Sequence, residues 1–264
     1  MTYSIERFPS LGLAASNPAP FQGGAGDEDE RVRTFPRPMG RRNGHDVAAV
    51  LVVDDSGSTL STDPKGHRYV AARRVVRWVR EDAMKRPAVS GNTRRGGRRH
   101  QFDDAVGVVH FADSARPVLP LTSLQSHFET VLRSLNKATD GGTAIVPALD
   151  SAAAVHRHDG SRLPITIVWT DGGIGEDLDQ LEKALSRHEP GSVHVVIFDE
   201  TGGAQQVADQ WAHLPFGSVS AVGSMATSDI ESLYARPIVE VMGLTWREPP
   251  CRNQRTSNRK KATP

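Results

Sequence analysis

The stretch AVLVVDDSGST, residues 49–59, joins a run of aliphatic residues to a cluster of acids, hydroxyls and glycine. Short continuous apolar runs predict strands that are buried on both faces, as in parallel sheets covered by helices. Asp54, Ser56 and Ser58 come at the end of this run, so we expect them in the loop at the carboxyl end of the strand. The stretch therefore predicts an α/β fold and marks a place where a ligand could bind.

The rest of the chain alternates between strands of this kind and amphipathic helices. Apolar runs predict five strands, at 48–53, 105–111, 165–169, 193–198 and 218–222. Apolar residues at spacings of three and four predict helices over about 69–83, 124–135, 145–155 and 178–185. Such alternation gives right-handed crossovers, so we expect a doubly wound, Rossmann-like α/β domain with a mostly parallel sheet and helices on both faces. In these sheets ligands bind at the carboxyl ends of the strands.

Composition sets the domain boundaries and excludes several classes of protein. With 264 residues, 38% of them hydrophobic, and a net charge of +1, the chain can bury one substantial core. We expect a disordered arm at 1–44, one domain at 45–245 and a basic disordered tail at 246–264. The single cysteine, Cys251, excludes an internal disulfide and a thiolate metal cluster. Because no segment reads as a secretory signal or a membrane span, we expect a cytoplasmic protein.

Two further strand ends carry oxygen ligands. The segment TDGGTAIVPALD places Thr143 just before the third predicted helix, and ITIVWTDGG places Asp171 directly after a strand. With Asp54, Ser56 and Ser58 they offer two carboxylates and three hydroxyls but no nitrogen or sulfur. Hard divalent cations select such ligands, so the pattern predicts a site for Mg²⁺ or Mn²⁺.

These five positions, in this order, resemble the metal-ion-dependent adhesion site of von Willebrand factor A domains, in particular the intracellular bacterial type. The segment VGVVHFADSARPVLPLT, 106–122, is similar to the second strand and following hairpin of that family. The resemblance implies that Ser56, Ser58 and Thr143 are inner ligands, whereas Asp54 and Asp171 act as outer or switching ligands. It assigns no role to Asp55, which occupies a variable position.

The resemblance also implies a function. In the family, one coordination place stays open for an acidic group of a partner, so we expect a protein-recognition module and not an enzyme. Bacterial members suggest partners such as a MoxR-type AAA+ ATPase or components of stress and defence systems. In relatives, ligand binding moves the last helix; here the last helical stretch, DIESLYARPIVEVM at 229–242, is expected to be broken by Pro237.

Other interpretations use other residues. A phospho-receiver domain would use Asp113 as phosphoacceptor, but no lysine follows a later strand. A metal-dependent phosphoesterase would use the same five ligands. A nucleic-acid binder would use the arginine-rich loop at 85–101, which lacks interleaved aromatic residues.

The histidines favour structural roles. His156 and His158 are a poor zinc pair because residues two apart do not share a helix face. His110 and His194 fall in predicted buried strands, where we expect hydrogen-bonded core histidines.

Overall fold

The computed structural model describes residues 45–85, 102–135, 141–157, 159, 161–171, 177–198, 203–222 and 227–244. All of them belong to the second of two compact units, which spans 36–264. The predicted arm at 1–44, the tail at 246–264 and nearly all of the arginine-rich loop lie outside the described residues. No helix among those described is long and apolar enough to cross a membrane.

Six strands form one mixed sheet in the order β3-β2-β1-β4-β5-β6. All neighbouring pairs are parallel except β2 with β3, which forms the antiparallel hairpin expected from the family resemblance. The strands are β1 (Val47–Asp54), β2 (Ala105–Phe111), β3 (Ala115–Ser123), β4 (Leu163–Thr170), β5 (Val193–Phe198) and β6 (Ser218–Val222). The five predicted strands and the mostly parallel α/β class are thus confirmed.

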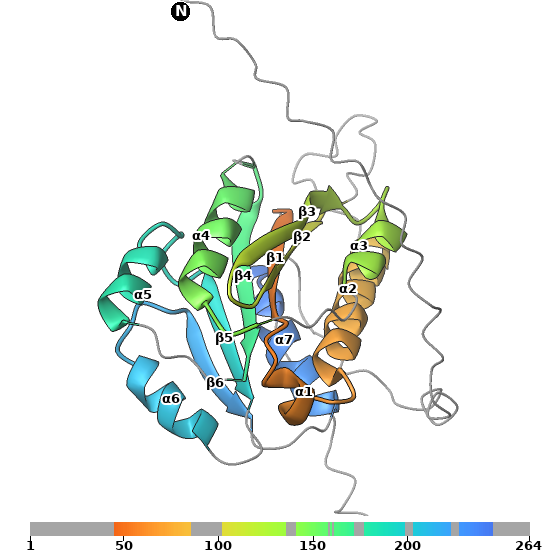
Figure 1. The fold of residues 1–264 in the computed structure, drawn as a ribbon. Coiled ribbons are helices and arrows are strands. Elements are labelled where there is room, and N and C mark those ends of the chain that lie inside the picture. The colour runs from red at the N-terminus through yellow and green to blue at the C-terminus, as the bar shows by residue number, and fades with distance from the viewer. Residues whose placement is uncertain are drawn as a thin grey trace, which may run out of the picture. The chain divides into compact units, whose positions relative to one another are not determined.

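The helices cover both faces of the sheet. They are α1 (Thr59–Thr62), α2 (His67–Lys85), α3 (Phe128–Ser134), α4 (Ile145–His156), α5 (Leu178–Leu185), α6 (Gly203–Trp211) and α7 (Thr227–Val241). Figure 1 shows α4, α5 and α6 on one side, and α2, α3 and α7 on the other. The four predicted helices are confirmed as α2 to α5, with small differences at their ends.

The central strand β1 shows why two helical layers are needed. Every one of its residues is buried. Leu51 and Val53 lie in the core formed with α2, α3 and α7, whereas Val50 and Val52 lie in the core formed with α4, α5 and α6. Successive strand residues point to opposite faces, so an uninterrupted apolar run has to be covered on both sides.

The last helix corrects one prediction. Pro237 does not break the helical stretch: it lies inside α7, which continues to Val241. A proline within a helix removes one backbone hydrogen bond and crowds the preceding turn. Here the turn after it is held by burial, because Ile238 and Val239 are 2% and 0% exposed in the core.

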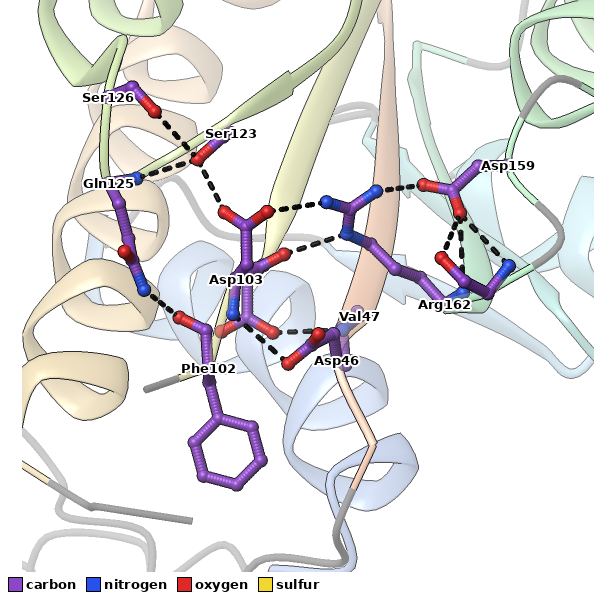
Figure 2. A network of polar contacts seen from close by, with 11 residues as sticks. Asp46, Val47, Phe102, Asp103, Ser123, Gln125, Ser126, Asp159 and Arg162 are labelled. Atoms are coloured by element: carbon purple, nitrogen blue, oxygen red, sulfur yellow. Dashed lines mark hydrogen bonds and ion pairs between the residues drawn. The ribbon is translucent and has the colours of Figure 1, made fainter. Parts of the chain in front are cut away.

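A polar network joins the strands at the edge where β1, β2 and β4 begin (Figure 2). Arg162 donates from Nε to the carbonyl of Asp103 and from Nη2 to its carboxylate, both at 2.7 Å, and also pairs with Asp159. The backbone N–H of Asp103 donates to the carboxylate of Asp46 at 3.0 Å. These contacts tie the beginnings of the strands together, at the edge opposite the predicted ligand site.

Candidate metal site

The carboxylate of Asp54, the last residue of β1, holds the loop that follows this strand. The Asp54 carboxylate accepts from the backbone N–H of Ser56 at 2.8 Å and from the Thr170 hydroxyl, at the end of β4, also at 2.8 Å. The hydroxyls of Ser56 and Ser58 lie 3.0 Å apart. Ser56 is buried and Ser58 is exposed; although Ser58 stands at the N-cap of α1, its side chain makes no capping hydrogen bond. Both serines therefore lie between the carboxyl end of β1 and the start of α1, with their hydroxyls in contact. Figure 1 shows α1 at this end of β1.

The segment that carries Thr143 is bound to this loop. The Gly57 N–H donates to the carbonyl of Gly141 at 2.9 Å, two residues before Thr143. The Gly142 N–H donates to the Asp113 carboxylate at 2.6 Å. Gly141 has φ +36°, and a Cβ added there would overlap the Asp113 carboxylate, so only glycine fits this approach. Thr143, half-buried, follows these contacts and lies two residues before the start of α4, separated from it by the N-cap residue Ala144.

Asp171 completes the group from the end of β4. It is 8% exposed, and the Thr62 hydroxyl of α1 donates to its Oδ2 at 3.2 Å. Burial raises the pKa of Asp54 above its ordinary value of 3.8, and the nearby Asp171 carboxylate raises it further, while hydrogen bonds from Ser56 and Thr170 oppose this shift. A carboxyl whose charge is disfavoured by burial and by a second carboxylate is a setting in which a bound cation is stabilising.

The donor set fits a hard divalent cation better than a softer metal. All five predicted residues offer oxygen, and they lie at one edge of the sheet on three segments that share hydrogen bonds. Within the described residues, no group of three or more His, Cys, Asp or Glu could hold a metal. A cation at this edge would therefore depend on the serine and threonine hydroxyls as well as the carboxylates.

Two acids near the site were not recognised from the sequence as supporting residues. Asp113, considered as a phosphoacceptor, instead accepts from the backbone of Gly142. Asp55, to which no role was assigned, is 3% exposed and bonds to Tyr69 and His110. The signal available for Asp55 was a histidine inside an apolar strand, which requires a buried polar partner.

The histidine predictions have a clear outcome. His110 and His194 are hydrogen-bonded core residues as expected: His110 bonds to Asp55 and the Ser134 carbonyl, and His194 to Ser218. His156 contacts the hydroxyl of Thr166 at 3.0 Å. His158 lies outside the described residues.

The fold is that of an α/β domain like the von Willebrand factor type A domains. Residues 49–174, which carry all five candidate ligands, match the family model described as von Willebrand factor type A domain. No curated protein sequence matches the chain.

Solved structures resemble the chain at low sequence identity. The pilus adhesin SpaC from Lactobacillus rhamnosus GG, in its open conformation, is 16% identical over 77% of this chain and 31% of that chain, with a TM-score of 0.55. The PilB minor pilin from Streptococcus sanguinis is 12% identical over 79% of this chain and 64% of that chain, with a TM-score of 0.51. A von Willebrand factor type A protein from Catenulispora acidiphila is 18% identical over 74% and 43%, with a TM-score of 0.48. These similarities concern the fold, and the chain spans less than two thirds of each of these structures.

Proposed function

We propose that this protein is a divalent-cation-dependent recognition module, in which Mg²⁺ or Mn²⁺ binds at the carboxyl edge of the sheet. The observation that carries the proposal is the gathering of acids and hydroxyls at one edge of the sheet. The carboxylates of Asp54 and Asp171 interact there. The hydroxyls of Ser56 and Ser58 lie 3.0 Å from each other, and hydrogen bonds join the segments that carry these residues. The family match over 49–174 supports it, since von Willebrand factor type A domains are generally interaction modules and often bind divalent metals.

The five residues would share the work of holding the cation. Ser56, Ser58 and Thr143 supply hydroxyl oxygens, and Asp54 and Asp171 supply the negative charge that balances the metal. When bound, the ion supplies a positive centre that attracts a carboxylate. A Glu or Asp of a partner protein would complete its coordination, so binding of the partner requires the metal.

The identity of the partner is a separate proposal. SpaC is a pilus adhesin and PilB a minor pilin, so domains of this fold serve in proteins of surface structures. For this chain we propose an intracellular partner, such as a MoxR-type AAA+ ATPase or a component of a stress or defence system. That choice, and the cytoplasmic location, rest on the sequence resemblance.

Thermal unfolding of the EDTA-stripped full chain, with and without Mg²⁺ or Mn²⁺, tests the metal site. Binding at 100 times the dissociation constant stabilises a fold by about 2.7 kcal/mol. Each kcal/mol shifts the melting temperature of a domain of this size by about 2–4 °C. We expect this rise in the wild type and its absence in the Ser56→Ala/Ser58→Ala variant.

Ser61→Ala is the matched control. Ser61 lies in α1, is exposed, and donates to the carbonyl of Ser58, but it is not a proposed ligand. It should keep the metal-dependent rise. If the wild type shows no rise at millimolar metal, or the double variant keeps the full rise, the proposed site is wrong.

A further inference from the structure

A buried polar cluster lies directly beside the candidate metal loop, on the side of α2. Asp55 stands between two proposed ligands, Asp54 and Ser56, but its carboxylate is turned to other partners. Oδ1 accepts from the hydroxyl of Tyr69 in α2, and Oδ2 lies 2.5 Å from Nδ1 of His110 in β2. With both oxygens engaged and the side chain 4% exposed, Asp55 is not available as a metal ligand.

The same cluster also contacts the loop at the backbone carbonyl of Ser56. The Thr59 hydroxyl donates to the carbonyl of Ser56 at 2.6 Å and accepts from Nη2 of Arg68 at 2.9 Å. Arg68 is fully buried; its Nη1 pairs with Asp63 at 2.8 Å, and its guanidinium carbon lies 4.6 Å from the centre of the Tyr69 ring. The loop is thus held at Asp55 by α2 and β2, and at Ser56 by α1 and α2.

His110 connects this cluster to α3. Its Nε2 lies 2.9 Å from the carbonyl oxygen of Ser134, which can only accept, so Nε2 donates. Asp55 is therefore linked through His110 to the last residue of α3, while Asp63 is paired with the Arg68 guanidinium.

Such a cluster is an inefficient way to stabilise a fold. Taking charges out of water costs so much that apolar replacements of a buried pair are often neutral or stabilising. Its geometric effect is specific, because Tyr69 and His110 contact the side chain of residue 55, and Arg68 reaches the backbone of residue 56 through Thr59. The Asp55 N–H adds a further bond, to the carbonyl of Phe111 at 2.7 Å.

We propose that Asp55 is a positioning residue, and that its network with His110, Tyr69 and Arg68 holds the 54–58 loop in its ligand-presenting shape before a cation arrives. This inference rests on the proposed metal site and extends it to residues that bind no metal. Residues that hydrogen-bond to metal ligands and orient them, without binding the metal, matter for affinity. Mutating such a residue weakens metal binding by about 10- to 100-fold.

The test compares the full chain with the apolar double variant Asp55→Val/His110→Val, which removes both partners of the buried Asp55–His110 contact. One measurement is Mn²⁺ affinity, from the electron paramagnetic resonance signal of the free ion. The other is hydrogen exchange in EDTA at the backbone amide of Gly57, a loop residue that neither substitution changes. We expect the dissociation constant to rise about 10- to 100-fold and the Gly57 amide to exchange faster.

Arg162→Leu is the matched control, because it disrupts a polar network at the opposite edge of the sheet (Figure 2). It should lower stability and leave both measurements unchanged. Tyr69→Phe is a milder second variant that deletes one donor to Asp55; it should raise the dissociation constant several-fold and keeps the test decisive if the double variant does not fold.

The two proposals fail in different ways. A wild type that binds no Mn²⁺ overturns the metal site, and Gly57 exchange in EDTA then decides the present inference: faster exchange in the variants supports it, and equal exchange overturns it. If the wild type binds Mn²⁺, an unchanged dissociation constant in the variants also overturns the positioning role.

Discussion

At the scale of single residues, the negative charge of Asp54 should lower the stability of the metal-free protein and favour binding of the metal. Its carboxyl is 0% exposed, and burial together with Asp171 raises its pKa. The ionised form is therefore costly in the metal-free protein. Asp54→Asn removes this charge while Oδ1 can still accept from the Ser56 N–H. We expect the melting temperature in EDTA to be unchanged or higher by about 2–4 °C per kcal/mol gained, and the metal-dependent rise to be lost.

Asp209→Asn is the charge-matched control for this variant. Asp209 is exposed on α6, far along the chain from the proposed ligands, and accepts from Gln205. It should retain the metal-dependent rise seen in thermal unfolding. A strongly destabilised Asp54→Asn protein in EDTA would contradict the electrostatic account.

The candidate ligands could be predicted from sequence because each follows or precedes a recognisable element and is of a residue type with clear chemistry. Thr143 and Asp171, for example, lie at the start of an apolar helical stripe and the end of an apolar strand. Asp55 could not be assigned in this way. Its partners, Tyr69 and His110, lie 14 and 55 residues away, and only the packing of α2 and the register of β1 and β2 bring them together.

At the scale of elements, the contact between α4 and β4 should be sensitive to acid. Burial lowers the pKa of His156, at the end of α4, to about 4, and the neighbouring His188 adds to this while Asp159 opposes it. The unfolded chain takes up this proton near the ordinary pKa of 6.5, so stability present above pH 6.5 is lost as the pH falls towards 4. His194, also lowered to about 4 by burial, acts in the same direction.

We therefore expect urea unfolding to give a smaller free energy at pH 5 than at pH 7, by about 1–2 kcal/mol for each of these histidines. His156→Gln should lose less stability over this range than the wild type. His213→Gln, at an exposed position, should behave as the wild type does. Equal free energies of unfolding at pH 7 and pH 5 would contradict the prediction.

The helix α7 contains a proline, Pro237, in its interior, where proline lowers helix stability. Proline in a helix interior is about 3 kcal/mol less favourable than alanine, although Pro237 is buried and its ring contributes packing. We expect Pro237→Ala to stabilise the protein by about 1 kcal/mol net, the helix gain exceeding the lost ring contacts. Thermal unfolding measures this directly. A fall in melting temperature would mean that the packing of the ring outweighs the missing hydrogen bond.

Elements differed in how well sequence predicted them, for physical reasons. Strands buried on both faces have continuous apolar runs, so β1, β2 and β5 were found with accurate ends. The edge strand β3 contains Pro117 and Pro120 and is mostly exposed or half-buried, so its periodicity is weak and only the family resemblance indicated it. The Pro237 prediction was wrong because local propensity did not include the burial that holds the end of α7.

At the scale of the whole molecule, two parts of the sequence compete as sites of function: the residues at the carboxyl edge of the sheet, with their acids and hydroxyls, and the arginine-rich segment at 85–101, which lies almost entirely outside the described residues. The sequence is nearly neutral overall, at +1, so binding to nucleic acid would depend on the local cluster Arg94, Arg95, Arg98 and Arg99. Phosphate contacts of this kind weaken steeply with salt and do not need a divalent metal. The two functions can therefore be separated by their response to salt and to EDTA.

We expect fluorescence anisotropy of a labelled oligonucleotide to show at most weak binding at about 50 mM salt and none at about 200 mM, with the same result in EDTA and in Mg²⁺. Changing the four arginines to alanine should abolish the low-salt binding and leave the metal-dependent rise in melting temperature intact. Ser56→Ala/Ser58→Ala should do the opposite, because its serines contribute no charge to nucleic-acid binding. Tight binding at the higher salt concentration that depends on the arginines would instead make nucleic acid the principal ligand of the molecule, and metal-dependent recognition a secondary property.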